Sequence, residues 1–222
     1  MKFSETMLMG LRQELQFLSK MEELLLKNKL IPLATLETKE EVNSICEILL
    51  ETGLQIFELT LRSAEAYDVA KEFQRFPDIT LGLGTIKSKE DIDFAISVNA
   101  KFGVSPGFSK ELSNHAIKND FLLIPGVITP SEVMNASNEG HKLLKLFPAK
   151  AFNSISLLKN YEAIFKDINF IPTGGINADN MYQFLERKNV IAVGASALFP
   201  SSLIKNKQWQ EIRTNLKVFL SQ

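Results

Sequence analysis

The sequence predicts an α/β protein, a (β/α)₈ TIM barrel with an extra N-terminal helix. Three observations lead to this prediction: short apolar runs of strand length, helix-start signals after several of them, and a regular spacing along the chain. Successive runs begin roughly 20–27 residues apart, about one βα unit each, and eight units make a closed barrel. An open doubly wound sheet uses the same units, but no Gly-x-Gly-x-x-Gly follows the first run, so the barrel is favoured.

Most of the predicted strands are continuously apolar rather than strictly alternating. This pattern is typical of parallel strands that are covered by helices. The expected strands are Leu30–Thr35, Gln55–Leu61, Ile79–Thr85, Phe102–Ser105, Phe121–Val127, Lys142–Phe147, Asn169–Thr173 and Val190–Ala195.

Helix-start signals follow several of these strands. Three segments have the spacing of a capping box, in which a Ser or Thr precedes an acidic residue by three positions. Further polar residues stand where a helix would begin, and two glycines stand where a helix would end. The capping pairs are Thr38–Glu41, Ser88–Asp91 and Thr129–Glu132; the single caps are Ser109 and Asn177; the terminating glycines are Gly53 and Gly140.

The segment before the first strand is predicted to be an amphipathic helix, with leucines three and four residues apart at Leu8, Leu11, Leu15 and Leu18. We expect one barrel domain over residues 1–222, with a helical extension over residues 1–29 packed on the barrel. Charged residues interrupt the apolar run that a secretory signal needs. The longest apolar stretch elsewhere is far short of the ~20 residues that span a bilayer, so no membrane segment is expected.

Composition narrows the functional classes. The chain has 25 Lys+Arg against 26 Asp+Glu and a net charge of −1, whereas nucleic-acid binders usually carry a basic field on one face. Its one cysteine, Cys46, excludes an internal disulfide framework and fits a reducing compartment. We therefore expect a cytoplasmic protein that binds neither nucleic acid nor membrane.

Reactive groups of a barrel come from the carboxyl ends of its strands. In the second predicted strand, alternation puts Glu58 and Arg62 on the face opposite Phe57 and Leu59. The apolar face suits the helices, so Glu58 and Arg62 are expected to point toward the barrel mouth. A buried structural ion pair between them remains an alternative to a catalytic role.

Lys145 stands near the end of the sixth predicted strand among apolar neighbours, including Leu143 and Phe147. Desolvation disfavours the charged form of a lysine, and a neutral amine can form a Schiff base with a carbonyl substrate. A lysine that extends its amine out to solvent is the alternative, and it is the expectation for Lys142 and Lys150. Lys145 differs because its strand end should meet that of Glu58.

Glycines stand at the carboxyl ends of the seventh and eighth predicted strands, at Gly174, Gly175 and Gly194. Backbone N–H groups exposed by such glycines can bind a phosphate, and many barrels hold one at this position. Simple turns are the alternative. His115 and His141 are too few and too isolated for a metal triad, and no carboxylate cluster has ligand spacing, so no metal site is expected.

Six motifs at the strand ends resemble, in order, those of the 2-keto-3-deoxy-6-phosphogluconate (KDPG) aldolases, a family that includes 4-hydroxy-2-oxoglutarate (KHG) aldolases. The similarity runs from about Leu30 to Ser196. The resemblance implies a class I aldolase on a (β/α)₈ barrel, a homotrimer without metal or cofactor, acting on a small 2-keto acid. The motifs are Glu58-Leu59-Thr60-Leu61-Arg62-Ser63, Gly82-Leu83-Gly84-Thr85, Ser105-Pro106-Gly107, Ile124-Pro125-Gly126, Lys145-Leu146-Phe147-Pro148-Ala149 and Pro172-Thr173-Gly174-Gly175-Ile176.

The resemblance also implies roles for individual residues. Lys145 matches the Schiff-base lysine and Glu58 the general acid/base. The other matches are binding positions: Arg62 and Thr85 for the pyruvate carboxylate, Pro106 beside it, Thr173 near the substrate hydroxyls, and Gly174, Gly175 and Ser196 for the phosphate. Three residues depart from the family pattern: Lys150 replaces a common acid, Ala195 is expected to add a methyl beside the phosphate, and Ala197 replaces a large ring. These departures bear on affinity for the phosphorylated end.

The resemblance favours cleavage of KDPG to pyruvate and glyceraldehyde 3-phosphate. Three other functions stay open. The first is the same chemistry on 4-hydroxy-2-oxoglutarate, which gives pyruvate and glyoxylate. The second is another phosphate-binding barrel enzyme, such as an epimerase, without a covalent lysine. The third is a non-catalytic sugar-phosphate-binding protein, against which the joint presence of Lys145, Glu58 and Arg62 counts.

Overall fold

The computed structural model describes residue 21 and residues 23–220. Helices alternate with parallel strands along these residues, as predicted. The strands are β1 (Leu30–Ala34), β2 (Ile56–Thr60), β3 (Thr80–Gly84), β4 (Phe102–Val104), β5 (Leu122–Ile124), β6 (Gly126–Val127), β7 (Leu143–Leu146), β8 (Asn169–Pro172) and β9 (Val193–Ala195).

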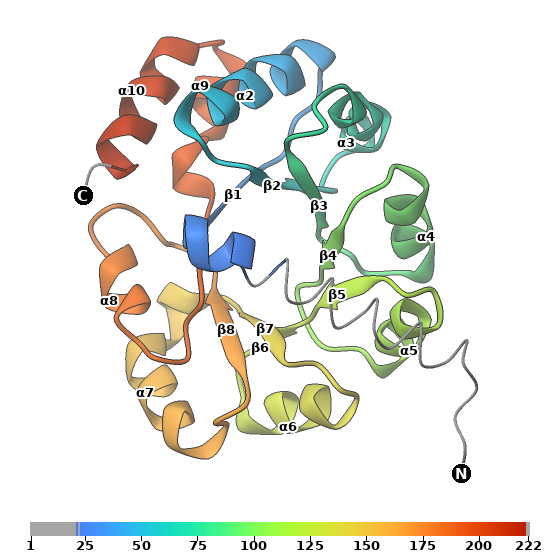
Figure 1. Cartoon of the computed structure of the whole chain (residues 1–222), viewed down its shortest axis with the longest axis vertical. Coiled ribbons are helices and arrows are strands. Elements are labelled where there is room, and N and C mark those ends of the chain that lie inside the picture. Colours follow the sequence, from blue (N-terminus) through green and yellow to red (C-terminus); the bar gives the residue numbers. More distant parts are fainter. Residues whose placement is uncertain (1–20, 22, 221–222) are drawn as a thin grey trace.

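The helices lie outside the strands and follow one another around them in chain order (Figure 1). They are α2 (Lys39–Thr52), α3 (Ala64–Val69), α4 (Lys89–Ser97), α5 (Lys110–Lys118), α6 (Pro130–Asn138), α7 (Ser154–Ile164), α8 (Met181–Leu185), α9 (Ser201–Lys205) and α10 (Trp209–Leu220). Three 3₁₀ segments are also present among the described residues: η1 (Ala70–Arg75), η2 (Ala149–Phe152) and η3 (Ser196–Leu198). No helix in the described part of the chain is long and apolar enough to cross a membrane.

The strands form two parallel sheets, in the orders β5-β4-β3-β2-β1-β9 and β6-β7-β8. The predicted α/β class with a parallel sheet is therefore confirmed. The fifth predicted strand is split into β5 and β6 by Pro125, because proline has no N–H to donate to a neighbouring strand. Isolated parallel bridges join Phe170 to Val190 and Thr173 to Gly194, between the two sheets.

Four of the five predicted helix caps are confirmed. Capping boxes start α2, α4 and α6, and the Ser109 side chain accepts a hydrogen bond at the start of α5. Asn177 is not a helix cap, because α8 begins at Met181 and the Asn177 side chain instead accepts from the Asp179 N–H. It closes a short turn of the kind that Asn favours.

Side chains on the two faces of the strands belong to two different buried clusters. The helix-facing cluster includes Phe57, Leu59 and Leu144 and packs against the surrounding helices. The interior cluster lies on the opposite face of the strands and consists of Met21, Leu25, Ile31, Ile56, Phe102, Val104, Ile124, Leu143, Ile171, Ile191 and Ala192. Ile31, Ile56, Phe102 and Leu143 stand early in their strands, so the interior is apolar at that end, and Val104 and Ile124 extend the cluster to the ends of β4 and β5.

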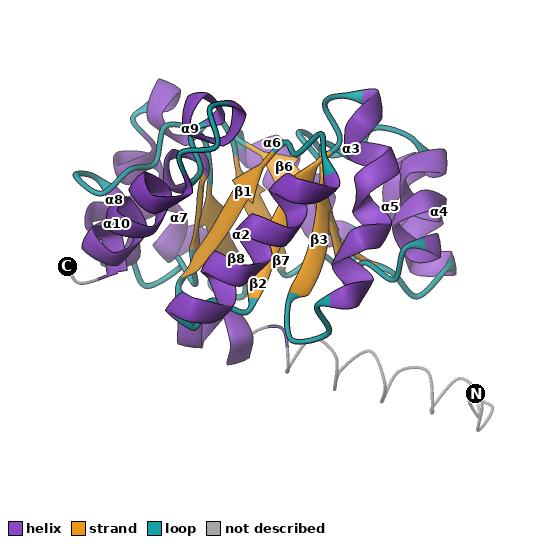
Figure 2. Cartoon of the chain, turned by 90° about the horizontal axis from the view of Figure 1, so that it is seen from above, coloured by secondary structure: helices purple, strands orange, loops and turns teal. Residues whose placement is uncertain are grey.

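The helical residues 23–28 lie across the end of the molecule where the strands begin (Figure 2). Leu25 of this short helix is buried in the interior cluster, and so is Met21, which precedes the helical residues 23–28. The helix therefore covers that end of the strands. Most of the predicted N-terminal helix, including Leu8, Leu11, Leu15 and Leu18, lies outside the described residues.

Candidate active site

Lys145 and Glu58 meet in the interior, beyond the apolar cluster. The Nζ atom of Lys145 lies 3.7 Å from Oε1 of Glu58, and their side chains are only 7% and 4% exposed. Because β7 and β2 do not pair with each other, the two side chains reach this point from different sheets. The structure thus confirms the predicted meeting of these strand ends. A basic and an acidic group so placed can act together on one small molecule.

Small residues on β3 give the Glu58 carboxyl its space. Glu58 pairs in register with Gly82, and a Cβ atom at Gly84 would collide with the Glu58 carboxyl group. Oε1 of Glu58 is buried and has no hydrogen-bond partner among the described residues. A buried carboxylate oxygen without a partner is costly to fold, and such atoms occur where a ligand or proton is received. This oxygen can therefore still accept a hydrogen bond, although the Lys145 amine lies 3.7 Å from it.

Lys145 is held by β7 between two paired neighbours, Gly126 on β6 and Ile171 on β8. Its backbone N–H donates to the Pro125 carbonyl at 2.9 Å, so the strand position is fixed on that side. Its Nζ also lies 5.0 Å from the centre of the Phe147 ring, a distance at which a cation is attracted to the ring face. The amine is thus oriented by both backbone and side-chain contacts.

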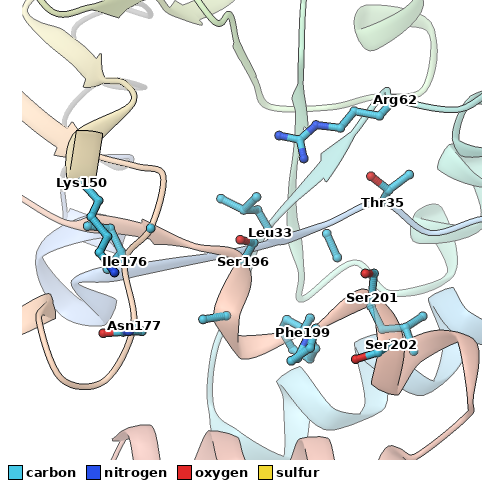
Figure 3. A pocket seen from close by; sticks show the side chains of 15 residues that line it. Leu33, Thr35, Arg62, Lys150, Ile176, Asn177, Ser196, Phe199, Ser201 and Ser202 are labelled. Atoms are coloured by element: carbon cyan, nitrogen blue, oxygen red, sulfur yellow. The ribbon is translucent and has the colours of Figure 1, made fainter. Parts of the chain in front are cut away.

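A pocket of about 500 Å³ opens at the ends of β1 and β9. Arg62, Gly175 and Ser196, three of the predicted site residues, line it, together with Thr35 and Lys150. Figure 3 shows Arg62 and Lys150 reaching into the pocket from opposite sides, with Ser196 between them. Glu58 and Lys145 are not in the lining, but Leu33 of the lining pairs in register with Glu58. The pocket therefore adjoins Glu58 and Lys145.

Four other predicted site residues do not line this pocket. Thr85 follows β3 with a positive φ of 68°, and the exposed Pro106 follows β4, with its carbonyl against Gly126. Thr173 is buried, and its hydroxyl donates to the Ile171 carbonyl at 3.3 Å. Gly174 has a φ of 99° and lies against Phe147. All four nevertheless stand at the carboxyl ends of strands.

Threonine hydroxyls provide a contact that sequence reasoning did not identify. The Oγ1 atoms of Thr35 and Thr60 lie 2.6 Å apart and share a hydrogen bond. Thr60 follows Glu58 on the same face of β2, and Thr35 follows β1 at the pocket wall. Thr60 is the last residue of β2 and Thr35 directly follows β1, and a polar residue at the end of a strand was the available signal.

Lys150 is exposed, as expected of a lysine that extends to solvent. Its side chain also lines the pocket, on the side opposite Arg62, which the expectation did not include. Its position follows from η2, which begins just after β7 and turns the chain back over the end of β8. Strand alternation could not predict this, because Lys150 lies beyond the strand.

The structure contradicts the expectation for Ala195. Its side chain is fully buried in the helix-facing cluster, so the methyl group points away from the pocket and cannot crowd a bound phosphate. The neighbouring Ser196 and Ala197 do line the pocket. The prediction was wrong because the alternation of β9 directs Ala195 outward toward the helices.

The histidines have structural partners. His141 is hydrogen-bonded through Nε2 to the Ser113 hydroxyl at 2.7 Å, and burial lowers the pKa of His141. His115 pairs with Asp93 on the surface at 2.7 Å. Among the described residues, no group of three His, Cys, Asp or Glu side chains is arranged to hold a metal ion.

Comparisons with known proteins agree with this geometry. The sequence profile of the family described as KDPG and KHG aldolase matches residues 21–215. A 2-dehydro-3-deoxy-phosphogluconate aldolase of Pseudomonas aeruginosa is 30% identical, over 83% of this chain and 84% of its own. The KHG/KDPG aldolase of Escherichia coli K12 is 29% identical, over 86% of this chain and 90% of its own.

The fold is also similar to that of a solved KDPG aldolase structure. It is the KDPG aldolase of Legionella pneumophila, with pyruvate captured at low pH as a covalent carbinolamine intermediate. The two folds superpose with a TM-score of 0.80 at 34% sequence identity, over 83% of this chain and 90% of that one.

Proposed function

Because this chain belongs to the KDPG and KHG aldolase family and is an aldolase, a carbon–carbon lyase, we propose that Lys145 and Glu58 perform its cleavage step. The substrate is KDPG, and the products are pyruvate and glyceraldehyde 3-phosphate. The observation that carries this proposal is the 3.7 Å approach of Lys145 Nζ to Glu58 Oε1 in a buried setting next to a pocket. It rests also on the names of the relatives, which are KDPG aldolases.

In this mechanism the Lys145 amine adds to the C2 carbonyl of the substrate to form a carbinolamine, which loses water to give an iminium. Glu58 then takes the proton of the C4 hydroxyl. The C3–C4 bond breaks, the aldehyde leaves, and the bonding electrons enter the iminium to form an enamine. Protonation at C3 and addition of water release pyruvate and restore the lysine.

The other site residues bind the substrate. Arg62 and Thr85 hold the 2-keto acid carboxylate, and the arginine does so in the fork geometry that a lysine lacks. Pro106 lies beside that group, and Thr173 lies near the substrate hydroxyls. Gly174, Gly175 and Ser196 offer backbone N–H groups to the phosphate. Their support is position, since Arg62, Gly175 and Ser196 line one pocket.

A second candidate is cleavage of 4-hydroxy-2-oxoglutarate to pyruvate and glyoxylate. One of the relatives, from Escherichia coli, is named for both substrates, which favours this candidate. Lys145 and Glu58 would act in the same way on this substrate, because both acids carry a 2-keto group and a 4-hydroxyl group on either side of the C3–C4 bond that breaks.

The test is a pyruvate-release assay on both acids with the purified chain. Faster release from KDPG, measured as kcat/KM, supports the first candidate, and faster release from 4-hydroxy-2-oxoglutarate supports the second. Release from neither acid would contradict both and favour an epimerase or a non-catalytic binding protein.

For the architecture, we propose that the two sheets close into one eight-stranded barrel over residues 1–222. The isolated bridges Phe170 to Val190 and Thr173 to Gly194 support closure on one side. On the other side, β5 and β6 follow each other around Pro125, whose carbonyl accepts from the Lys145 N–H. We further propose that the residues before β1 form one helical extension, of which the described part packs on the barrel.

We also propose a cytoplasmic homotrimer. The buried free thiol of Cys46 fits a reducing compartment, and the trimer rests on the family resemblance. Sedimentation equilibrium tests the assembly, because a trimer and a monomer of 25.0 kDa differ three-fold in mass.

A further inference from the structure

The pocket beside Glu58 and Lys145 is lined by two cations and by no carboxylate. Arg62 and Lys150 supply the positive charge, and the remaining polar side chains of the lining are hydroxyls and one amide. Figure 3 shows the two cations on opposite sides of the pocket, with Asn177 next to Lys150. A pocket with such a lining attracts anions rather than neutral groups.

Contacts with neighbouring residues hold Lys150 at the pocket wall. The N–H groups of Ala149 and Lys150 donate to the carbonyls of Thr173 and Gly174, at 2.8 and 3.0 Å. These bonds fix η2 against the loop after β8. Gly175 leaves room for the Lys150 side chain, since a Cβ atom there would lie 2.6 Å from Cβ and 2.9 Å from Cδ of Lys150.

Arg62 and Lys150 are both exposed, and neither has an ion-pair partner among the described residues, whereas Lys39, Lys89 and Lys110 each pair with a glutamate at 2.6 Å. The charges on Arg62 and Lys150 therefore remain available to a ligand. Arg62 stands four residues after Glu58 on the same strand end, while Lys150 enters from the other side. Two separated cations fit a ligand with two separated anionic groups.

We propose that Lys150 is the specificity-determining residue for substrates that carry a second anionic group at the end remote from the breaking bond. This inference rests on the proposed function, which assigns the first anionic group, the 2-keto acid carboxylate, to Arg62. The second group is a phosphate or a carboxylate. The lysine ammonium is a compact point charge and can bind both of these groups. Lys150 therefore selects the remote group by its charge more than by its shape.

The experiment compares three variants with the wild-type chain. Lys150→Met removes the charge and keeps the length of the side chain, and Lys150→Arg restores the charge. Lys142→Met is the matched control, because Lys142 is an exposed lysine just before β7, outside the pocket lining. Each is assayed for pyruvate release from KDPG, from 4-hydroxy-2-oxoglutarate, and from 2-keto-3-deoxygluconate, whose remote end is an uncharged hydroxyl.

Lys150 binds the remote anion of one of these substrates. For that substrate, Lys150→Met should raise KM roughly 10-fold, the scale of one charge-assisted hydrogen bond. Its kcat should stay unchanged, because contacts at the remote end are equal in the ground and transition states. KM for 2-keto-3-deoxygluconate should stay at the wild-type value, and Lys150→Arg should recover most of the loss. An effect on KDPG alone identifies a phosphate, and an effect on 4-hydroxy-2-oxoglutarate alone identifies a carboxylate.

A titration with inorganic phosphate, measured by isothermal calorimetry, tests the anion site without turnover. Phosphate should bind the wild-type chain and Lys142→Met equally and bind Lys150→Met about 10-fold more weakly. Equal phosphate binding by all three proteins, or an equal rise of KM for charged and uncharged substrates, would overturn the proposal. If no acid is cleaved but phosphate binding still depends on Lys150, then the proposed substrates are wrong and the anion site stands.

Discussion

The side-chain nitrogen of Lys145, on β7, lies 3.7 Å from Oε1 of Glu58, on β2, although the two strands belong to different sheets. Both side chains are almost fully buried, and this oxygen of Glu58 has no hydrogen-bond partner among the described residues. A purely structural ion pair would satisfy its carboxylate more completely, because unpaired buried oxygens are costly. The incomplete pairing fits the proposed role of Glu58 as an acid/base group.

Borohydride should trap pyruvate on Lys145, because only a covalent imine can be reduced onto the protein. Peptide mapping by mass spectrometry should place the adduct on the peptide that contains Lys145. Lys145→Arg should lose both adduct and turnover, since a guanidinium stays protonated and forms no imine. An adduct on Lys142 or Lys150, or none, would contradict the assignment.

Glu58→Gln should lower kcat by about 10²–10⁴-fold, the usual contribution of a general acid or base. Glutamine has the same volume and forms hydrogen bonds, but it cannot take the C4 hydroxyl proton. The variant should still form some reducible imine with pyruvate. Single-turnover kinetics and a denaturation curve measure the two effects. Loss of folding without a selective kinetic defect would favour the structural ion-pair interpretation.

Gly84→Ala should lower kcat by roughly 100-fold, because the added methyl would collide with the Glu58 carboxyl and move it from Lys145. Gly107→Ala is the control, since a Cβ atom there meets nothing within 4 Å. Steady-state kinetics of both variants on KDPG check the prediction. Equal kcat values for the two variants would show that the position of Glu58 does not limit the reaction.

Ala195→Gly should lower the free energy of unfolding by about 1 kcal/mol, because it adds backbone freedom in β9 and removes a buried methyl. KM for KDPG should not change, since the methyl lies in the helix-facing cluster. Urea denaturation and steady-state kinetics separate the two effects. A lower KM with unchanged stability would instead place the methyl at the phosphate.

Stability should fall as the pH drops below about 6.5, the ordinary pKa of histidine, in part because of His141. Burial lowers the pKa of His141 in the folded chain, so the unfolded chain takes up its proton at a higher pH. The contribution is fully present above the unfolded pKa and is lost as the pH falls toward the folded value. Urea denaturation at several pH values measures it.

His141→Gln should flatten this pH dependence, and the surface variant His115→Gln should retain the contribution of His141. An unchanged slope in His141→Gln would assign the acid sensitivity to other groups.

Much of the fold could be predicted from the sequence because each strand is a separate local pattern. The alternation of β2 placed Phe57 and Leu59 toward the helices and Glu58 away from them, and the structure agrees. Pro125 divides one predicted strand in two, which shows that an apolar run alone does not define hydrogen bonding. Strand patterns thus predict faces better than they predict bounds.

The site was predictable only as far as strand alternation reaches. Lys145 and Glu58 stand within strands, so their meeting followed from alternation and the order of the strands. Lys150 stands beyond β7 in a 3₁₀ segment, where the direction of a side chain depends on contacts with a loop far along the chain. Ala195 was assigned to the pocket because of its position in the family pattern, and its own alternation pointed the other way.

The apolar cluster that fills the interior from Met21 to Ala192 has a consequence for how the protein can change. Its residues Leu25, Ile31, Ile56 and Leu143 lie at the end where the strands begin, whereas η2 and η3, beside the pocket, lie at the end where strands finish. Ala149 of η2 and Leu198 of η3 are buried in the helix-facing cluster, whereas Lys150, Ser196 and Ala197 line the pocket. We expect substitutions at these three lining residues to change which substrate binds and to leave the interior cluster intact. The pocket lining can then vary while the packing between the strands stays the same.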